Sequence, residues 1–185
     1  MKKYKKILIV THQYLPHVSP RTTRWKLLVD ELIANGHNVS ILTGMYPDFD
    51  TNNVEILYFG NKNNINIVSN LREKSKQVAS GDAIKKIFYG VLKKIYRFFI
   101  NYLAWPDYSM FWLYQIYKNR NKISKDYDVI ISVSLPFSSH MAAYFINKKV
   151  KKHWIMDVGD PFSLKLDAPE NNRFLYSGLN KRYEK

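Results

Sequence analysis

The sequence predicts an α/β fold, a doubly wound and mostly parallel sheet with flanking helices. Short runs of β-branched residues and leucine alternate along the chain with longer segments whose apolar residues recur at helical spacing. Such alternation is typical of β-α-β units. The first run, residues 7–10, is apolar throughout, as expected of a strand that is covered on both faces of a parallel sheet.

A helix is predicted after the first strand and its loop. Its apolar residues recur at intervals of three and four and form one face; they are Trp25, Leu28, Val29, Leu32 and Ile33. Ser19 and Pro20 suit the N-terminal cap and first turn, and Gly36 suits the left-handed position after a helix. Residues 38–43 then predict a second strand, which a right-handed crossover makes a parallel neighbour of the first.

The alternation continues to the end of the chain. Further strands are predicted over residues 54–59, 128–134 and 153–157, and further helices over 84–102, 109–123 and 138–149. The helix over 109–123 is apolar nearly all round, which predicts a buried or paired position. Residues 61–66 are rich in asparagine and predict a loop, residues 72–80 are expected to be disordered or mobile, and residues 180–185 look helical.

Length and composition restrict the class of protein. With 185 residues the chain fits a single domain, here residues 1–185 with a helical insertion at about 82–124. Because cysteine is absent, disulfide frameworks, zinc ribbons and thiol nucleophiles are excluded, in agreement with a reducing compartment. We expect a cytoplasmic protein, with neither an export signal nor a transmembrane helix.

The helix over 84–102 combines an apolar face with a cationic one. The chain has 29 Lys and Arg against 15 Asp and Glu, a formal net charge of +14, which attracts phosphate, anionic lipid or nucleic acid. Compositional drift is an alternative origin of this excess. Within the helix the basic residues share one side and no acidic residue occurs; they are Lys85, Lys86, Lys93, Lys94 and Arg97. This pattern is typical of an interfacial helix, and with Trp105 these residues are candidates for membrane contact. Alternatively, the apolar face packs on the sheet.

The loop and helix start after the first strand offer a candidate anion site. Helix N-termini bind anions, and arginine forks suit phosphate. The candidate residues for binding an acceptor or phosphate here are Ser19, Arg21, Thr22 and Arg24. In the alternative interpretation Ser19 only caps the helix and the arginines are solvated. Dinucleotide and P-loop glycine motifs are absent from the sequence.

Several blocks of the sequence resemble glycosyltransferase family 4. The opening is carried by residues 7–11 (ILIVT), 18–24 (VSPRTTR) and 32–39 (LIANGHNV), and the later part by residues 132–140 (SVSLPFSSH) and 154–163 (WIMDVGDPFS). The resemblance covers essentially the whole chain. It implies a Rossmann-like domain that forms the N-terminal, acceptor-side half of a GT-B fold, in an enzyme that transfers a sugar with retention from a nucleotide-sugar.

The resemblance also implies what this chain lacks. The family's paired glutamates, which hold the donor, belong to a C-terminal domain, and no two glutamates here stand eight positions apart. We therefore expect the chain alone to be inactive and to bind no cofactor itself. Family members generally lack the metal-binding Asp-x-Asp site, so no metal is expected despite the spacing of Asp157 and Asp160.

The two later blocks supply candidate catalytic and binding residues by resemblance. His140, with Ser138 and Ser139, would face the cleft and hydrogen-bond the transferred sugar or a phosphate. Asp157 and Asp160 would orient an acceptor hydroxyl or accept its proton. The alternatives are a histidine at a helix start without a ligand, and an Asp160 that only caps a turn.

Together these features predict a glycosyltransferase half that acts at a membrane. The expected acceptor is a lipid-linked or cell-envelope saccharide on the inner face of the cell membrane, where the protein would be peripheral, and the other expected partners are the donor domain and an anionic membrane surface. The alternative is a non-catalytic basic module for nucleic acid or another anionic polymer. Nucleic acid is not expected, because RNA-binding and zinc-finger signatures are missing.

Overall fold

The computed structural model describes residues 4–44, 54–60, 83–102, 105–124, 126–159, 178–179 and 181–183. Its elements are β1 (Lys6–Val10), α1 (Pro20–Ala34), β2 (Asn38–Thr43), β3 (Glu55–Tyr58), α3 (Ala83–Tyr102), α4 (Met110–Asn119), β4 (Val129–Val133), α5 (Ser138–Val150) and β5 (His153–Asp157). The predicted alternation of strands and helices is confirmed. The predicted loop at 61–66 and the predicted mobile segment at 72–80 lie outside the described residues.

The five strands form one sheet in the order β3-β2-β1-β4-β5, and every pairing is parallel. β1 lies at the centre, where Leu8 pairs with Ser40 of β2 and Ile130 of β4. Chain order therefore runs outward from β1 to β3 on one side and from β4 to β5 on the other. This is the predicted Rossmann-like, doubly wound fold.

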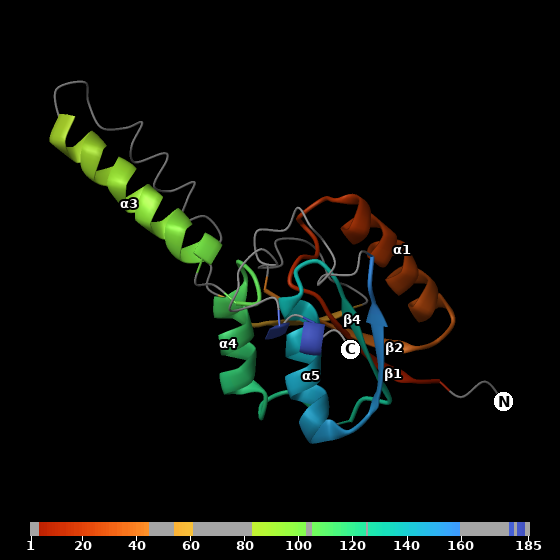
Figure 1. Cartoon of the computed structure of the whole chain (residues 1–185). Coiled ribbons are helices and arrows are strands. Elements are labelled where there is room, and N and C mark those ends of the chain that lie inside the picture. The colour runs from red at the N-terminus through yellow and green to blue at the C-terminus, as the bar shows by residue number, and fades with distance from the viewer. Residues whose placement is uncertain are drawn as a thin grey trace.

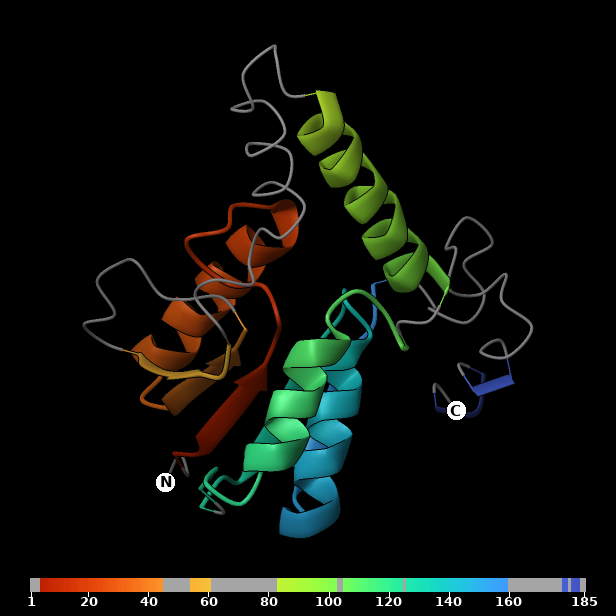
Figure 2. The ribbon, with the colours of Figure 1, turned by 90° about the vertical axis from the view of Figure 1, so that its left-hand side faces the viewer.

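Helices cover both faces of the sheet, with α1 on one face and α4 and α5 on the other (Figures 1 and 2). Successive β1 residues point to opposite faces, so Ile7 and Ile9 join Trp25 and Val29 of α1 in one buried cluster. Leu8 and Val10 join a second cluster with the buried side chains of α4 and α5. The continuous apolar pattern of β1 is thus explained by burial on both sides.

The ends of α1 are as predicted. Ser19 and Thr22 form a capping box, in which Thr22 N donates to Ser19 Oγ at 3.2 Å and Ser19 N donates to Thr22 Oγ1 at 2.7 Å. After the helix Gly36 adopts a φ of +85°, a left-handed conformation that favours glycine.

Helix α4 is shorter than predicted, since it ends at Asn119 and not at Ile123. Ile123 is nevertheless buried in the core cluster, from the turn that follows, so its apolar character reflects core packing and not helical spacing. The expectation of a buried or paired helix holds for one side only. Trp112 is buried against the sheet, while Tyr114 is 59% exposed.

Helix α3 projects from the α/β body (Figures 1 and 2). Its apolar side chains are exposed, with Phe88 at 61%, Ile95 at 59% and Phe98 at 60%. The alternative in which this face packs on the sheet is therefore wrong for these side chains. Among the described residues, no helix is long and apolar enough to span a membrane.

Candidate functional site

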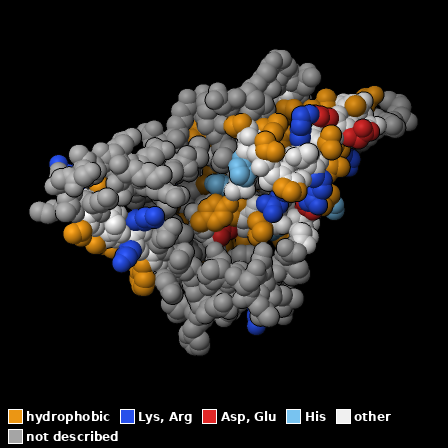
Figure 3. Space-filling model, turned by 90° about the horizontal axis from the view of Figure 1, so that it is seen from above, with side chains coloured by type: hydrophobic (Ala, Val, Ile, Leu, Met, Phe, Trp, Pro, Cys, Tyr) orange, Lys and Arg blue, Asp and Glu red, His pale blue; other side chains and the backbone are white. Residues whose placement is uncertain are grey.

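The carboxyl ends of β1 and β4 mark the candidate site. The chain winds outward in opposite directions from these two central strands, and in open α/β sheets ligands bind at such a switch point, beyond the carboxyl ends. The loops at residues 11–19 and 134–137 border it. Viewed from this side, histidine side chains lie near the middle, beside hydrophobic ones and flanked by lysine or arginine (Figure 3).

A buried carboxylate, Asp107, organises this edge. Its side chain accepts four hydrogen bonds, from the backbone N and Oγ of Ser109 at 2.9 and 2.7 Å and from the backbone N and Oγ of Ser138 at 2.8 and 2.7 Å. All three residues are less than 5% exposed. Because Ser138 begins α5, the positive end of that helix also favours the carboxylate. Asp107 thereby ties the start of α4 to the start of α5.

His12 follows β1 and lies beside this cluster. Its backbone N donates to Ser139 Oγ at 3.1 Å, and its ring centroid lies 5.8 Å from that of Tyr108 and 5.2 Å from that of Trp112. A Cβ at Gly44 would lie 2.6 Å from the His12 ring, so only glycine leaves room here. Among the described residues, the buried Nδ1 of His12 has no hydrogen-bond partner.

Burial lowers the pKa of the His12 imidazole to about 4. The Asp107 carboxylate acts in the opposite direction, while His17 adds to the lowering. The ring is therefore neutral at physiological pH, and a neutral imidazole nitrogen can accept a hydrogen bond from a hydroxyl group. His12 is thus chemically suited to orient a polar ligand at the switch point.

His140 lies in the first turn of α5 with only 2% of its surface exposed. Its Nδ1 is 2.7 Å from the Oγ of Ser132, which also accepts a hydrogen bond from Trp154 Nε1 at 2.8 Å. The histidine is therefore held by Ser132 of β4, which Trp154 of β5 also contacts. Together with Ser138 and Ser139 it lies at the predicted strand-to-helix junction, but all three residues are at most 2% exposed, so their predicted contact with a ligand stays a prediction.

The residues predicted to bind phosphate all have partners within the protein. Ser19 and Thr22 pair in the cap described above, which favours the capping interpretation. Arg21 Nη1 donates to the carbonyl oxygen of Leu135 at 2.8 Å, and Arg24 Nη2 lies 2.5 Å from Asp157 Oδ2. The alternative interpretation therefore holds for the cap at Ser19 but not for the arginines, which are both paired, although the side chain of Arg24 is still 53% exposed.

The predicted acid pair is only partly described. Asp157 ends β5 and accepts hydrogen bonds from Arg24 and from Trp25 Nε1, the latter at 2.7 Å. Its carboxylate therefore anchors α1 to β5. Asp160 lies outside the described residues.

The residues predicted to touch a membrane differ in environment. Lys85 and Lys94 are exposed and Lys93 is half-buried, whereas the side chains of Lys86 and Arg97 lie outside the described residues. Trp105 is half-buried and packs against the core cluster. The exposed cations and apolar side chains thus belong to α3, and Trp105 forms its junction with the body.

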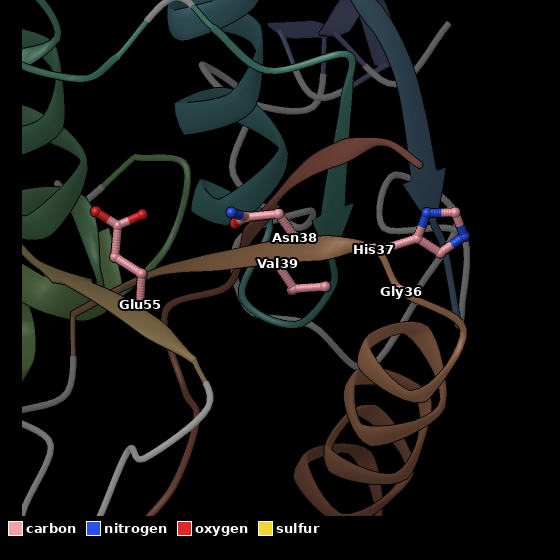
Figure 4. A pocket seen from close by; sticks show the side chains of 5 residues that line it. All are labelled: Gly36, His37, Asn38, Val39 and Glu55. Carbon is pink, nitrogen blue, oxygen red and sulfur yellow. The ribbon is translucent and has the colours of Figure 1, made fainter. Parts of the chain in front are cut away.

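The described residues line hollows at two places, one at the opposite edge of the sheet and one beside the first turn of α5. One of about 510 Å³ lies at the amino ends of β2 and β3, lined by Gly36, His37, Asn38, Val39 and Glu55 (Figure 4). Parallel sheets bind ligands at the opposite edge, so we assign no site there. The other, of about 350 Å³, is lined by residues that include His140 and Trp154. No group of three potential metal-ligating side chains occurs in the described part of the chain.

Sequence reasoning missed Asp107 and His12. Asp107 precedes Ser109 in a turn after Pro106, a pattern that indicates a local cap, but its contact with Ser138 spans 31 positions. His12 follows the first strand directly, at a position where ligands bind. That position was the available signal for His12, whereas its burial depends on the distant Trp112.

The environment of His12 generates a prediction for stability against pH. The pKa of His12 is lowered from 6.5 to about 4 in the folded state. Between these two pH values, therefore, His12 binds a proton in the unfolded chain but not in the folded chain. The free energy of unfolding should rise with pH between about 4 and 6.5, by up to about 3 kcal/mol from this residue. Urea unfolding at several pH values should show a flatter dependence for His12→Gln. An equal dependence in both proteins would contradict this assignment.

No protein-family model matches the chain, and no curated protein matches it.

Proposed function

We propose that this chain is the N-terminal, acceptor-side half of a retaining glycosyltransferase of the GT-B fold. The transferred sugar would come from a nucleotide-sugar held by a separate donor domain. The acceptor would be a lipid-linked or cell-envelope saccharide. No metal and no cofactor of this half enter the proposal.

One observation carries the proposal: three of the five blocks that resemble family 4 meet at the carboxyl edge of the sheet. They are the first block (residues 18–24), the second (132–140) and the third (154–163). Arg21 of the first block donates to Leu135 of the second at 2.8 Å. Arg24 of the first block pairs with Asp157 of the third. Gly159 N of the third donates to Ser134 Oγ of the second at 3.1 Å. Blocks more than 100 positions apart thus form one surface, as a shared site requires.

The residues of this surface suit the binding of hydroxyl-rich ligands. The guanidinium of Arg24 is half exposed and has further N–H groups besides the one that meets Asp157. The neutral His12 ring supplies an acceptor, and Ser139 fixes the loop that holds it. In the proposal His140 orients the transferred sugar, while Asp157 positions Arg24 and is not itself the proton acceptor.

The exposed face of α3 supports a peripheral membrane location. Burying a phenylalanine or isoleucine side chain contributes roughly 1.5–3 kcal/mol, and each basic residue contributes about 1 kcal/mol at an anionic leaflet. Phe88, Ile95 and Phe98 are each about 60% exposed, beside exposed Lys85 and Lys94. A helix of this kind would bring the acceptor-side edge close to a lipid-anchored acceptor on the cytoplasmic leaflet.

The transferase proposal predicts saccharide binding at the switch point. In ligand-observed NMR, oligosaccharide acceptors should bind the chain more strongly than a nucleotide-sugar does. Arg24→Gln should weaken this binding by about tenfold, since it removes a charged donor. Lys26→Gln, which removes another charge from α1, one paired with Asp30, serves as the matched control and should have little effect. Tight binding of single-stranded oligonucleotides without saccharide binding would replace the proposal with the nucleic-acid module.

The membrane proposal predicts that α3 controls association with lipid. Co-sedimentation with vesicles should require anionic lipid and weaken more than about tenfold when Lys85, Lys86, Lys93, Lys94 and Arg97 are neutralised. Phe88→Ser with Phe98→Ser should also weaken binding, but without changing its dependence on salt. Neutralising Lys148, Lys151 and Lys152, which lie on the body away from α3, is the control. Equal loss in the control variant would contradict a specific role for α3.

A further inference from the structure

The hollow of about 350 Å³ lies between α5, β5 and the C-terminal segment at residues 181–183. Its volume falls within the range of small-molecule sites. The described residues that line it are His140 and Tyr144 from α5, Trp154 and Met156 from β5, and Arg182 and Tyr183 from the C-terminal segment. One end therefore adjoins the first turn of α5, at the candidate edge of the sheet.

The inner wall is held in place by a fully buried hydroxyl group. Ser132 is 0% exposed, and its Oγ accepts from Trp154 Nε1 at 2.8 Å and lies 2.7 Å from His140 Nδ1. Both rings are therefore fixed before a ligand arrives. Preorganisation of this kind lowers the cost of ordering side chains on binding.

The aromatic rings form a tilted cup. The centroids of Tyr144 and Trp154 lie 6.4 Å apart at an interplanar angle of 49°, and those of Tyr144 and Tyr183 lie 6.1 Å apart at 73°. The rings do not form a parallel-sided slot for a planar nucleobase. Tilted rings instead suit a puckered ring, whose polarised C–H groups contact the negative faces of aromatic side chains.

The charges of the pocket favour an anion. Arg182 is exposed at the mouth, and no carboxylate is among the described residues that line the pocket. Asp157, the acidic residue of β5, is hydrogen-bonded to Arg24 and Trp25 of α1, on the other face of the sheet. A guanidinium that meets no carboxylate among the described residues can bind phosphate or carboxylate through two parallel hydrogen bonds.

We propose that this pocket binds an anionic monosaccharide unit, a sugar ring that bears a phosphate. The sugar ring would lie against Tyr144, Trp154 and Tyr183, and the phosphate would meet Arg182. This inference rests on the proposed function, for which it names the acceptor class. The Tyr183 ring lies 5.5 Å from that of Trp105, so this wall of the pocket is close to the segment that follows the helix proposed to dock on the membrane.

The test is to titrate the whole chain separately with glucose 1-phosphate, glucose and inorganic phosphate. Calorimetry and ligand-observed NMR measure the binding of each. Glucose 1-phosphate should bind at least tenfold more tightly than either of the other two. Arg182→Gln should remove most of the tighter binding of glucose 1-phosphate, because a charged hydrogen bond to the phosphate is lost. The affinity for glucose should stay within about twofold of that of the unaltered chain. Lys181→Gln, an exposed cation in the same segment that does not line the pocket, should leave both unchanged. Tyr183→Ala should weaken the binding of both glucose and glucose 1-phosphate.

A second arm distinguishes the source of the sugar phosphate. Neutral vesicles that carry a polyprenyl-phosphate-linked glucose should retain the chain more than plain neutral vesicles if the ligand is lipid-anchored, and Arg182→Gln should abolish the difference. Binding of soluble glucose 1-phosphate alone indicates a free sugar phosphate.

Several outcomes would overturn the pocket assignment. These are no binding in either arm, equal binding of inorganic phosphate and glucose 1-phosphate, and equal effects of Arg182→Gln and Lys181→Gln. Saccharide binding that depends on Arg24 would still stand in each case, so failure of the pocket and failure of the proposed function can be told apart.

Discussion

The organisation of the candidate site depends on one buried carboxylate. A charged group that leaves water must be fully hydrogen-bonded, or its burial costs several kcal/mol. Asp107 meets this requirement through the four donors of Ser109 and Ser138. These donors come from the starts of two different helices, so the requirement of one side chain fixes how α4 and α5 meet. The turn that begins α5 is thereby held against the carboxyl end of the sheet.

The position of this turn determines the rest of the edge. Once Ser138 is fixed, Ser139 reaches the backbone N of His12, and His140 reaches Ser132. Strands β1 and β4 are thus linked beyond their carboxyl ends as well as through their own ladder. On the other face, Asp157 links β5 to α1 through Arg24 and Trp25. The polar groups of this edge are largely hydrogen-bonded to one another, so the edge is rigid before any ligand binds.

Helix α3 stands outside this arrangement because both faces of the sheet are already covered. α1 covers one face, and α4 and α5 cover the other (Figures 1 and 2). The exposed apolar side chains of α3 therefore find no place in the two core clusters. A face of this kind marks a surface for interaction in soluble proteins, and its cationic neighbours favour an anionic partner.

The strands and helices could be predicted because their signals are local. The apolar run of β1 and the spacing of Trp25 and Val29 reflect the faces on which these residues are buried. The position of the site could be predicted from the sequence, but the contacts of its side chains could not. The sequence predicts that Arg21 and Arg24 bind phosphate, but tertiary folding brings Leu135 and Asp157 to them from more than 100 positions away. The burial that lowers the pKa of His12 likewise comes from distant residues.

Amide hydrogen exchange on Asp107→Asn tests most directly whether this carboxylate fixes the edge. Asparagine keeps the shape but replaces one acceptor oxygen with a donor group. The amides of Ser109 and Ser138 should lose more than about tenfold of their protection, while amides of β1 such as Leu8 should keep theirs. Unchanged protection at Ser138 would contradict the account, because the start of α5 would then be held without the carboxylate.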